Sequence, residues 1–294
     1  MPIQNKIWKK SPSPLYPGRH ELNLKDLSVL IPLIDWHYFY LAWHVQASTE
    51  AANQLRQDAE IELEKLLSLK ILRASSVVAF FPVLRNGDSL QVYSSSETIS
   101  EKPIAHFHFL RMQEILGKDA YCSIADYFNP NELDYIGTFA LSASLGLEKA
   151  LAQTDDPYRS LLWKTLAARL TEAYAEYMHK EVMQKWWGYA LDKSFGIRPV
   201  PGYPTTPDHS ELETLWKLLA PESIEMHLTE SRMMIPEASI CGYYVAHPSS
   251  HYFNIRHIGN DQLADYALRK GWSLEQAKQE LKNLILDHLL NGFI

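Results

Sequence analysis

Apolar residues recur at intervals of three and four in two long stretches of the chain, which predicts two amphipathic helices. The first stretch covers residues 35–69 and places Leu55, Ala59 and Leu63 on one stripe. The second and clearer stretch covers residues 155–187. We expect both helices to bury their apolar stripes in the core of a globular domain.

Capping residues predict where three further helices begin. Asp208 has capping-box spacing to Glu211 and should start a helix over residues 209–219. Asn260 and Ser273 are expected to cap two helices that close the chain.

Other segments have the shorter period that is typical of strands. Residues 75–94 hold two apolar runs around Asn86 and Gly87, which predicts a hairpin because both central residues tolerate positive φ. Residues 103–112 alternate and should continue that sheet, whereas residues 134–143 fit either a strand or the start of a buried helix. Three later strands are predicted, at residues 224–230, 238–246 and 251–258.

The order of these elements favours the α+β class, because strands and helices do not alternate as they do in a doubly wound fold. We expect a mainly antiparallel, twisted sheet with several flanking helices. Residues 1–26 carry four prolines and no sustained period, and are interpreted as an extended arm. Residues 27–294 are interpreted as one domain.

Composition and charge narrow the function classes. The formal net charge is −7 and no long run of lysine or arginine stands out, which argues against a nucleic-acid partner. No apolar run is long enough to cross a membrane and no secretory signal is recognisable, so we expect a cytoplasmic location. Cys122 and Cys241 are expected to be free, buried thiols, with a single disulfide as the alternative.

Common catalytic and metal-binding motifs are missing. There is no phosphate-binding glycine loop, nucleophile elbow or paired zinc motif. His247 and His251 have half of a zinc spacing and no matching second pair, so no metal site is predicted. Glu176 and His179 form one E-x-x-H pair, which we interpret as solvated helix positions.

The stretch "GIRPVPGYPTTPDH", residues 196–209, holds four prolines and two glycines. Prolines disfavour both helix and sheet, so the backbone should be extended and short of hydrogen-bond partners. Gly202 permits close approach of another group, and Arg198 supplies a guanidinium suited to a carboxylate. From spacing alone, a ligand-binding strip and a structural loop with a surface arginine both remain open.

Five ordered motifs together resemble the activation domain of cobalamin-dependent methionine synthase. The proline strip resembles the family's R-P-x-P-G-Y-P signature, and "LIDWHYFYLAW" resembles its early I-D-W motif. The hairpin, the long helix and the C-terminal strands with their closing helices follow in the same order, over roughly residues 27–285.

The resemblance implies a C-shaped α+β domain that binds S-adenosylmethionine (AdoMet) in a shallow groove. In the family, this module restores an enzyme whose cobalamin has been oxidised to cob(II)alamin. A one-electron reduction, often from flavodoxin, and methyl transfer from AdoMet return the cofactor to its active form. The implied partner is therefore a cobalamin-binding methionine synthase or a related corrinoid protein, which holds the cobalamin.

The resemblance also implies the residues of the site. Asp35 and Glu172 match acidic ligand contacts, and Arg198 matches the arginine expected at the ligand carboxylate. Val200 is expected to offer backbone polar groups beside Gly202, and Tyr203, the one residue assigned to the catalytic step, should lie near the reacting methyl group. Tyr252 and Phe253 are expected to border the adenosine.

Two departures from the family keep alternatives open. Only "LDKSF", residues 191–195, precedes the strip, where the family has a longer acidic insertion. The chain also shows no homocysteine, folate or cobalamin module, so it is either free-standing or part of a larger polypeptide and should not make methionine alone. One alternative function is a docking module for a corrinoid protein that no longer binds AdoMet. The other is an independent methyltransferase, for which no acceptor motif is found.

Overall fold

The computed structural model describes residues 13–98, 102–116, 119–189 and 196–285. A six-stranded antiparallel sheet forms its centre, with the strand order β10-β7-β2-β3-β4 and β1 paired to β2. The sheet strands are β1 (Gly18–Leu24), β2 (Arg73–Asn86), β3 (Ser89–Val92), β4 (Ala105–His108), β7 (Asp134–Leu145) and β10 (Ile240–Tyr244). Two small hairpins consist of β5 (Ile115–Leu116) with β6 (Asp119–Ala120), and β8 (His227–Leu228) with β9 (Met234–Ile235).

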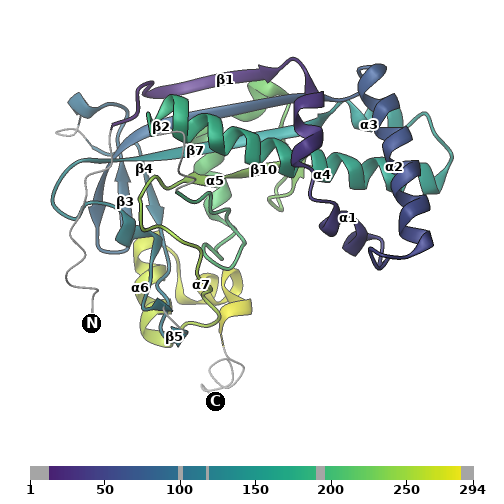
Figure 1. The fold of residues 1–294 in the computed structure, drawn as a ribbon. Helices are drawn as coiled ribbons and strands as arrows, with labels where there is room; N and C mark the ends of the chain where they lie inside the picture. The colour runs from purple at the N-terminus through teal and green to yellow at the C-terminus, as the bar shows by residue number, and fades with distance from the viewer. Residues whose placement is uncertain (1–12, 99–101, 117–118, 190–195, 286–294) are drawn as a thin grey trace.

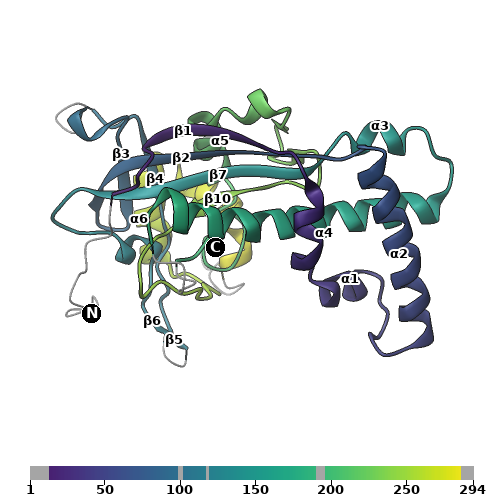
Figure 2. The same ribbon diagram turned by 45° about the horizontal axis from the view of Figure 1, so that its top comes forward.

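Helices cover both faces of this sheet. The α-helices are α1 (Trp36–Ala42), α2 (Glu50–Ser68), α3 (Leu147–Leu151), α4 (Pro157–Glu181), α5 (Glu211–Leu219), α6 (Asn260–Lys270) and α7 (Leu274–Glu280). Figure 1 shows α1 with α2 at one end of the sheet and α6 with α7 at the other, both projecting to the same side, which gives the C shape. The turned view in Figure 2 again shows α1 and α2 at one end of the sheet and α6 at the other. The structure therefore confirms a single α+β fold.

Alternation along β2 divides the apolar core into two. Val77 and Ala79 face a core that includes α5 and α6, whereas Val78 and Phe80 face a core that includes α2 and α4. Because successive strand residues point to opposite faces, a strand that is covered on both sides reads as a continuous apolar run. This explains why the sequence pattern of β2 shows little alternation.

The long helix begins as predicted. The Asp156 side chain accepts hydrogen bonds from the N–H groups of Tyr158 and Arg159, and Pro157 occupies the first turn. Its interior residues Leu162, Leu166 and Leu170 are buried. One π-helical turn, Val182–Trp186, extends the helix at its C-terminal end.

The predicted helix over residues 35–69 is wrong as a single element. Residues 43–49 interrupt it and separate α1 from α2. Thr49 starts α2 by accepting a hydrogen bond from Ala52 N–H, which is an N-cap that the apolar stripe could not reveal. The stripe itself is confirmed, because Leu55, Ala59 and Leu63 are buried in α2.

The arm predicted for residues 1–26 is only partly within the described chain. Its residues Gly18–Leu24 form β1, which pairs along β2 from Phe80 to Ala74. This part of the arm therefore belongs to the sheet, while residues 1–12 lie outside the described residues. The domain boundary at residue 26 stays a prediction.

The β2–β3 hairpin is confirmed with a shift of one position. Asn86 pairs with Ser89, so Gly87 and Asp88 are the central residues of the turn. Gly87 has φ +60°, whereas Asn86 and Asp88 do not have positive φ. A glycine alone at the first central position is the pattern of a type II′ turn.

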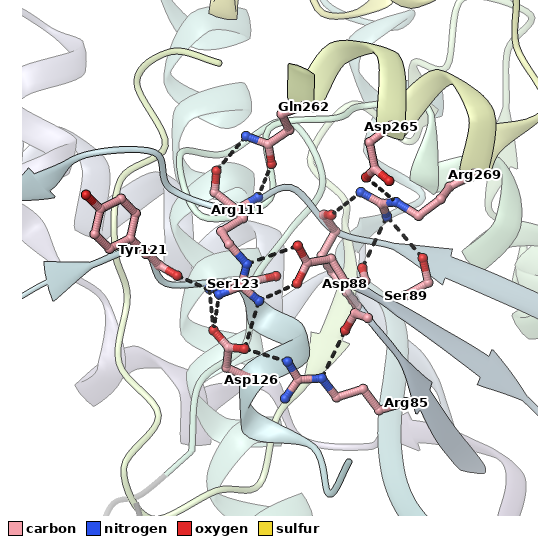
Figure 3. A network of polar contacts seen from close by, with 12 residues as sticks. Arg85, Asp88, Ser89, Arg111, Tyr121, Ser123, Asp126, Gln262, Asp265 and Arg269 are labelled. Carbon is pink, nitrogen blue, oxygen red and sulfur yellow. Dashed lines mark hydrogen bonds and ion pairs between the residues drawn. The ribbon is translucent and has the colours of Figure 1, made fainter. Parts of the chain in front are cut away.

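Arg111 anchors this hairpin to the short 3-10 helix Ile124–Tyr127 that follows β6 (Figure 3). Its guanidinium donates to Asp126 Oδ2 at 2.7 Å and to Asp88 Oδ2 at 3.0 Å. Arg85 donates to the same Asp126 carboxylate at 2.7 Å. These paired charges stabilise the end of the sheet near β3 and β4.

Several predicted helix and strand boundaries in the C-terminal third are wrong. The N-cap of α6 is Gly259, not Asn260, whereas Ser273 caps α7 as predicted by accepting from Gln276 N–H. Residues 251–258 form no strand, and the predicted strand at 224–230 reduces to the short β8. As predicted, Cys122 and Cys241 are buried thiols that are not joined by a disulfide. Within the described residues, no helix is both long enough and apolar enough to cross a membrane.

Candidate ligand-binding groove

The proline strip begins as an additional edge on strand β10. Ile197 and Val245 exchange two backbone hydrogen bonds, of 3.1 and 2.9 Å. The carbonyl oxygen of Pro199 then accepts from Tyr243 N–H at 2.9 Å. A proline lacks an N–H but keeps its acceptor, so this side of the strip can pair with β10 in spite of its prolines.

Gly242 permits this close approach. A Cβ atom at residue 242 would lie 2.5 Å from the carbonyl oxygen of Pro199 and 3.1 Å from Val200 Cγ2. Distances below 3.0 Å to a backbone atom cannot be relieved by moving a flexible side chain. The close packing of the strip therefore favours glycine at residue 242 of β10.

We expect Gly242→Ala to lower the free energy of unfolding by about 1–3 kcal/mol, the usual cost of adding a methyl group to a filled core. Chemical denaturation followed by circular dichroism measures this change. A variant as stable as the wild type would contradict the close contact between β10 and the strip.

The strip then turns twice within seven residues, from Val200 to Thr206. Tyr203 N–H donates to the Val200 carbonyl oxygen at 3.2 Å, around Pro201 and Gly202, whose φ is +89°. Proline followed by glycine with positive φ is the pattern of a type II turn. Thr206 N–H closes the second turn on the Tyr203 carbonyl oxygen at 2.9 Å.

These turns correct one expectation about Val200. Its carbonyl oxygen is not free, because it accepts from both Tyr203 N–H and Thr206 Oγ1, the latter at 2.7 Å. Within the described residues, no hydrogen bond from its N–H is found. The backbone group that Val200 can offer to a ligand is therefore the N–H.

Residues 251–258 run beside the strip instead of forming the predicted strand. Ile255 N–H donates to the Pro204 carbonyl oxygen at 2.9 Å, and Thr205 Oγ1 donates to the Phe253 carbonyl oxygen at 2.7 Å. The prolines and turns of the strip leave too few regularly spaced N–H groups for a ladder. This segment brings its aromatic residues to the same place as the strip.

A groove of about 1030 Å³ lies along the strip. Seven of the eight site residues suggested by the sequence line it: Glu172, Arg198, Val200, Gly202, Tyr203, Tyr252 and Phe253. They come from α4, from the strip and from the segment after β10. Segments far apart in sequence thus meet at one surface, as the resemblance implies.

Asp35 is the exception, because it does not line the groove. It is the N-cap of α1, where its side chain accepts from His37 N–H at 2.9 Å. Tyr38, one turn further along α1, lines the groove instead and is 56% exposed. The role of Asp35 in ligand binding stays a prediction.

Arg198 is held by hydrogen bonds from both its backbone and its side chain. Its backbone N–H donates to Tyr252 Oη at 2.9 Å, and its guanidinium Nη1 donates to Glu176 Oε2 at 2.8 Å. Burial alone would raise the pKa of Glu176, but the charge of Arg198 and its hydrogen bond outweigh burial and lower that pKa. Glu176 is therefore ionised and paired at neutral pH.

This pairing corrects the interpretation of the E-x-x-H pair. Glu176 is half-buried against Arg198, and His179 is buried with its ring edge-on to Tyr244. Neither residue is a fully solvated helix position. The sequence did hold a signal that Glu176 faces the site. Its i, i+4 spacing from Glu172 places both carboxylates on one side of α4.

The groove combines aromatic rings with charges of both signs. Tyr203 and Tyr252 are 61% and 55% exposed, whereas Phe253 is buried and forms part of the floor. Glu172 is exposed, and Arg256 adds an exposed cation that no sequence signal indicated. Such a surface suits a small ligand with a flat ring, an anionic group and a cationic group.

A buried ionic cluster lies where the strip ends. Lys270 Nζ donates to Glu211 Oε1 at 2.6 Å and lies 3.2 Å from Asp208 Oδ2. The Lys270 side chain is 9% exposed, and those of Asp208 and Glu211 are 4% exposed. Tyr266 Oη donates to Asp208 at 2.6 Å, and Tyr243 Oη donates to Glu211 at 3.2 Å.

This cluster overturns the predicted capping box. Asp208 accepts from Ser210 N–H, and Ser210, with no side-chain cap bond, is the N-cap of α5. Burial raises the pKa of Glu211. Asp208 is buried as well, but the charge of Lys270 and hydrogen bonds outweigh burial and lower its pKa. The two carboxylates therefore join the end of the strip and the start of α5 to Lys270 of α6, and they do not form a capping box.

Fold and groove together define a class: an α+β domain that presents an open, charged and aromatic groove beside a proline strip. Over residues 26–271, the chain matches the sequence profile of the family described as vitamin B12 dependent methionine synthase, activation domain. Since this match spans most of the chain, the chain belongs to that family. The resemblance noted from the sequence motifs is confirmed.

A solved structure supports the same assignment. The chain is similar to the MetH reactivation domain in a crystal structure bound to AdoHcy, with a TM-score of 0.86 and 35% sequence identity. The similarity covers 94% of this chain and 93% of the other chain. The two chains therefore share nearly their whole fold.

Proposed function

We propose that this chain binds AdoMet in the groove and presents its methyl group to a cobalamin held by a partner protein. The observation that carries the proposal is the convergence of seven site residues on one groove. The related MetH reactivation domain was crystallised with AdoHcy, the product that AdoMet becomes after losing its methyl group. The proposed partner is a cobalamin-binding methionine synthase.

The charges of the groove suit the charges of AdoMet. Arg198 would bind the α-carboxylate, since a guanidinium can donate two parallel hydrogen bonds to it. Glu172 would lie on the side of the α-ammonium and sulfonium, with Asp35 as a further acidic contact. Val200 N–H, next to Gly202, would add one backbone donor.

The adenosine would lie against Tyr252 and Phe253, because a purine gains contact area on aromatic faces. Tyr203 would then stand beside the sulfonium methyl group, where its exposed ring can limit the directions from which an acceptor approaches. This orientation leaves the methyl group at the open side of the groove.

The proposed reaction is reductive methylation of cob(II)alamin. One electron, for which flavodoxin is the proposed donor, gives cob(I)alamin. The cobalt then attacks the methyl carbon, so a Co–C bond forms, the S–CH₃ bond breaks and AdoHcy leaves with the bonding electron pair. No proton transfer is required, so the groove has to position and orient the ligand rather than supply an acid or base.

Isothermal titration calorimetry of the wild-type chain tests the binding step. We expect AdoHcy and AdoMet each to bind with a stoichiometry of one per chain, in the same groove. If neither ligand gives a binding signal, the proposal fails.

A second experiment tests the partner and the reaction. The chain is mixed with a cobalamin-binding methionine synthase that lacks its own activation domain, together with AdoMet and a one-electron reductant. The absorption spectrum should change from cob(II)alamin to methylcobalamin only when the chain is present. Retention of the chain by this partner without any AdoMet binding would instead support the docking alternative. The short segment on which that alternative is based, residues 191–195, lies outside the described residues.

A further inference from the structure

Glu176 lies behind the groove arginine in a three-residue charge array. Its carboxylate accepts from Arg198 Nη1 at 2.8 Å and lies 3.4 Å from Lys180 Nζ, one turn further along α4. The Arg198 side chain is 24% exposed and that of Glu176 is 38% exposed. Glu176 itself does not line the groove, whereas Arg198 does.

The contact with Glu176 occupies only part of the guanidinium. Arginine has five N–H donors in a planar fork, and Glu176 uses one at Nη1. Within the described residues, the Nε and Nη2 donors of Arg198 have no acceptor. The Nε–Nη2 edge can bind a carboxylate with two parallel hydrogen bonds.

The charges of the array leave a net attraction for an anion. Glu176 alone would cancel the charge of Arg198 and repel a carboxylate, but Lys180 lies on its other side. The two cations and one anion of this array carry a net charge of +1, whereas Glu172, which lines the groove, is a separate negative charge. The contact with Glu176 also removes part of the rotamer freedom of the arginine side chain before a ligand arrives.

We propose that Glu176 is a positioning residue for ligand binding: it holds the Arg198 guanidinium so that its free edge receives the ligand carboxylate, while Lys180 offsets the charge of Glu176. This inference rests on the proposed AdoMet-binding function. It assigns to Glu176 an effect on only one part of the ligand, because the adenosine is bound elsewhere in the groove.

Two probe ligands separate positioning from general structure. AdoHcy carries the carboxylate, whereas 5′-methylthioadenosine keeps the adenosine and the thioether and lacks the carboxylate. We expect Glu176→Gln to weaken AdoHcy binding roughly three- to tenfold, since a partly exposed ion pair and some rotamer order are lost. Binding of 5′-methylthioadenosine should not change.

Glu181→Gln is the matched control. Glu181 lies on the same helix and pairs with Lys185 at 2.8 Å, in an i, i+4 contact away from Arg198. This variant should bind both ligands as the wild type does. In addition, Glu176→Gln should cause no further loss in a chain that already carries Arg198→Ala, because there is no guanidinium left to position.

Three outcomes of the calorimetry would overturn the inference. AdoHcy binding that is equal or tighter in Glu176→Gln would mean that Glu176 is neutral or competes with the ligand. A similar loss for both ligands would mean a structural role. Absence of AdoHcy binding by the wild type would overturn the proposed function, and this inference with it, so the two failures are distinguishable.

Discussion

Replacing Arg198 with alanine should weaken AdoHcy binding by about 10- to 150-fold, as calorimetry would measure. The estimate follows from losing charge-assisted hydrogen bonds to the carboxylate, which contribute about 1.5–3 kcal/mol in sites of this kind. The substitution also leaves Glu176, behind the groove, without its guanidinium partner, so the local charge becomes less favourable for an anion. Affinity for 5′-methylthioadenosine should be nearly unchanged.

Arg73→Ala is the control for loss of an arginine. Arg73 forms an exposed, two-point ion pair with Glu225 and does not line the groove. The Arg73→Ala variant should therefore bind AdoHcy like the wild type. If Arg198→Ala kept wild-type affinity, the assignment of the carboxylate to Arg198 would be wrong even if the chain binds AdoHcy.

Replacing Lys270 with methionine should lower the free energy of unfolding by about 3–5 kcal/mol, the usual effect of removing one partner from a buried ion pair. The loss arises because Asp208 and Glu211 remain buried beside each other without a cation. Chemical denaturation measures this effect. Because Asp208 ends the strip, the groove should also become less ordered.

A second measurement makes this prediction specific to charge. Burial, followed by the charges of Lys270 and Arg269, lowers the pKa of His108 to about 4. The pKa of His108 should therefore rise in Lys270→Met, which a proton NMR titration can follow. Lys217→Met, at an exposed position of α5, is the control and should change neither the free energy of unfolding nor the pKa of His108. A loss of stability below about 1 kcal/mol for Lys270→Met would contradict the ionic role of the cluster.

The groove depends on interactions that the strip makes with its supports as much as on the strip itself. Gly242 allows Pro199 to approach β10, and Tyr252 holds the backbone of Arg198. At the other end, Asp208 joins the strip to Lys270 of α6. A ligand would thus meet a backbone that is already fixed at both ends, which lowers the ordering cost of binding.

Much of the fold follows from local patterns in the sequence. The period of three and four residues located α4, the apolar runs around Gly87 located the hairpin, and Ser273 located the start of α7. These signals are local because a helix buries residues on one stripe and a cap satisfies N–H groups in its own first turn. The break between α1 and α2 was missed because the apolar spacing continues across it.

The sequence by itself also determined the family and most of the groove. Its ordered motifs pointed to the activation domain, and its proline strip marked Arg198, Gly202 and Tyr203, which line one groove. Prolines and glycines carry this information because they restrict or release the backbone at their own positions.

Only the tertiary structure decided what each charged side chain contacts. Glu176 appeared to be a solvated helix position and proves to be the partner of Arg198, and Asp208 appeared to be a helix cap and proves to be part of a buried cluster with Lys270. Tyr38 and Arg256 likewise reach the groove from segments distant in the chain. Ion pairs and groove linings join residues that are far apart in sequence, so spacing along the chain does not encode them.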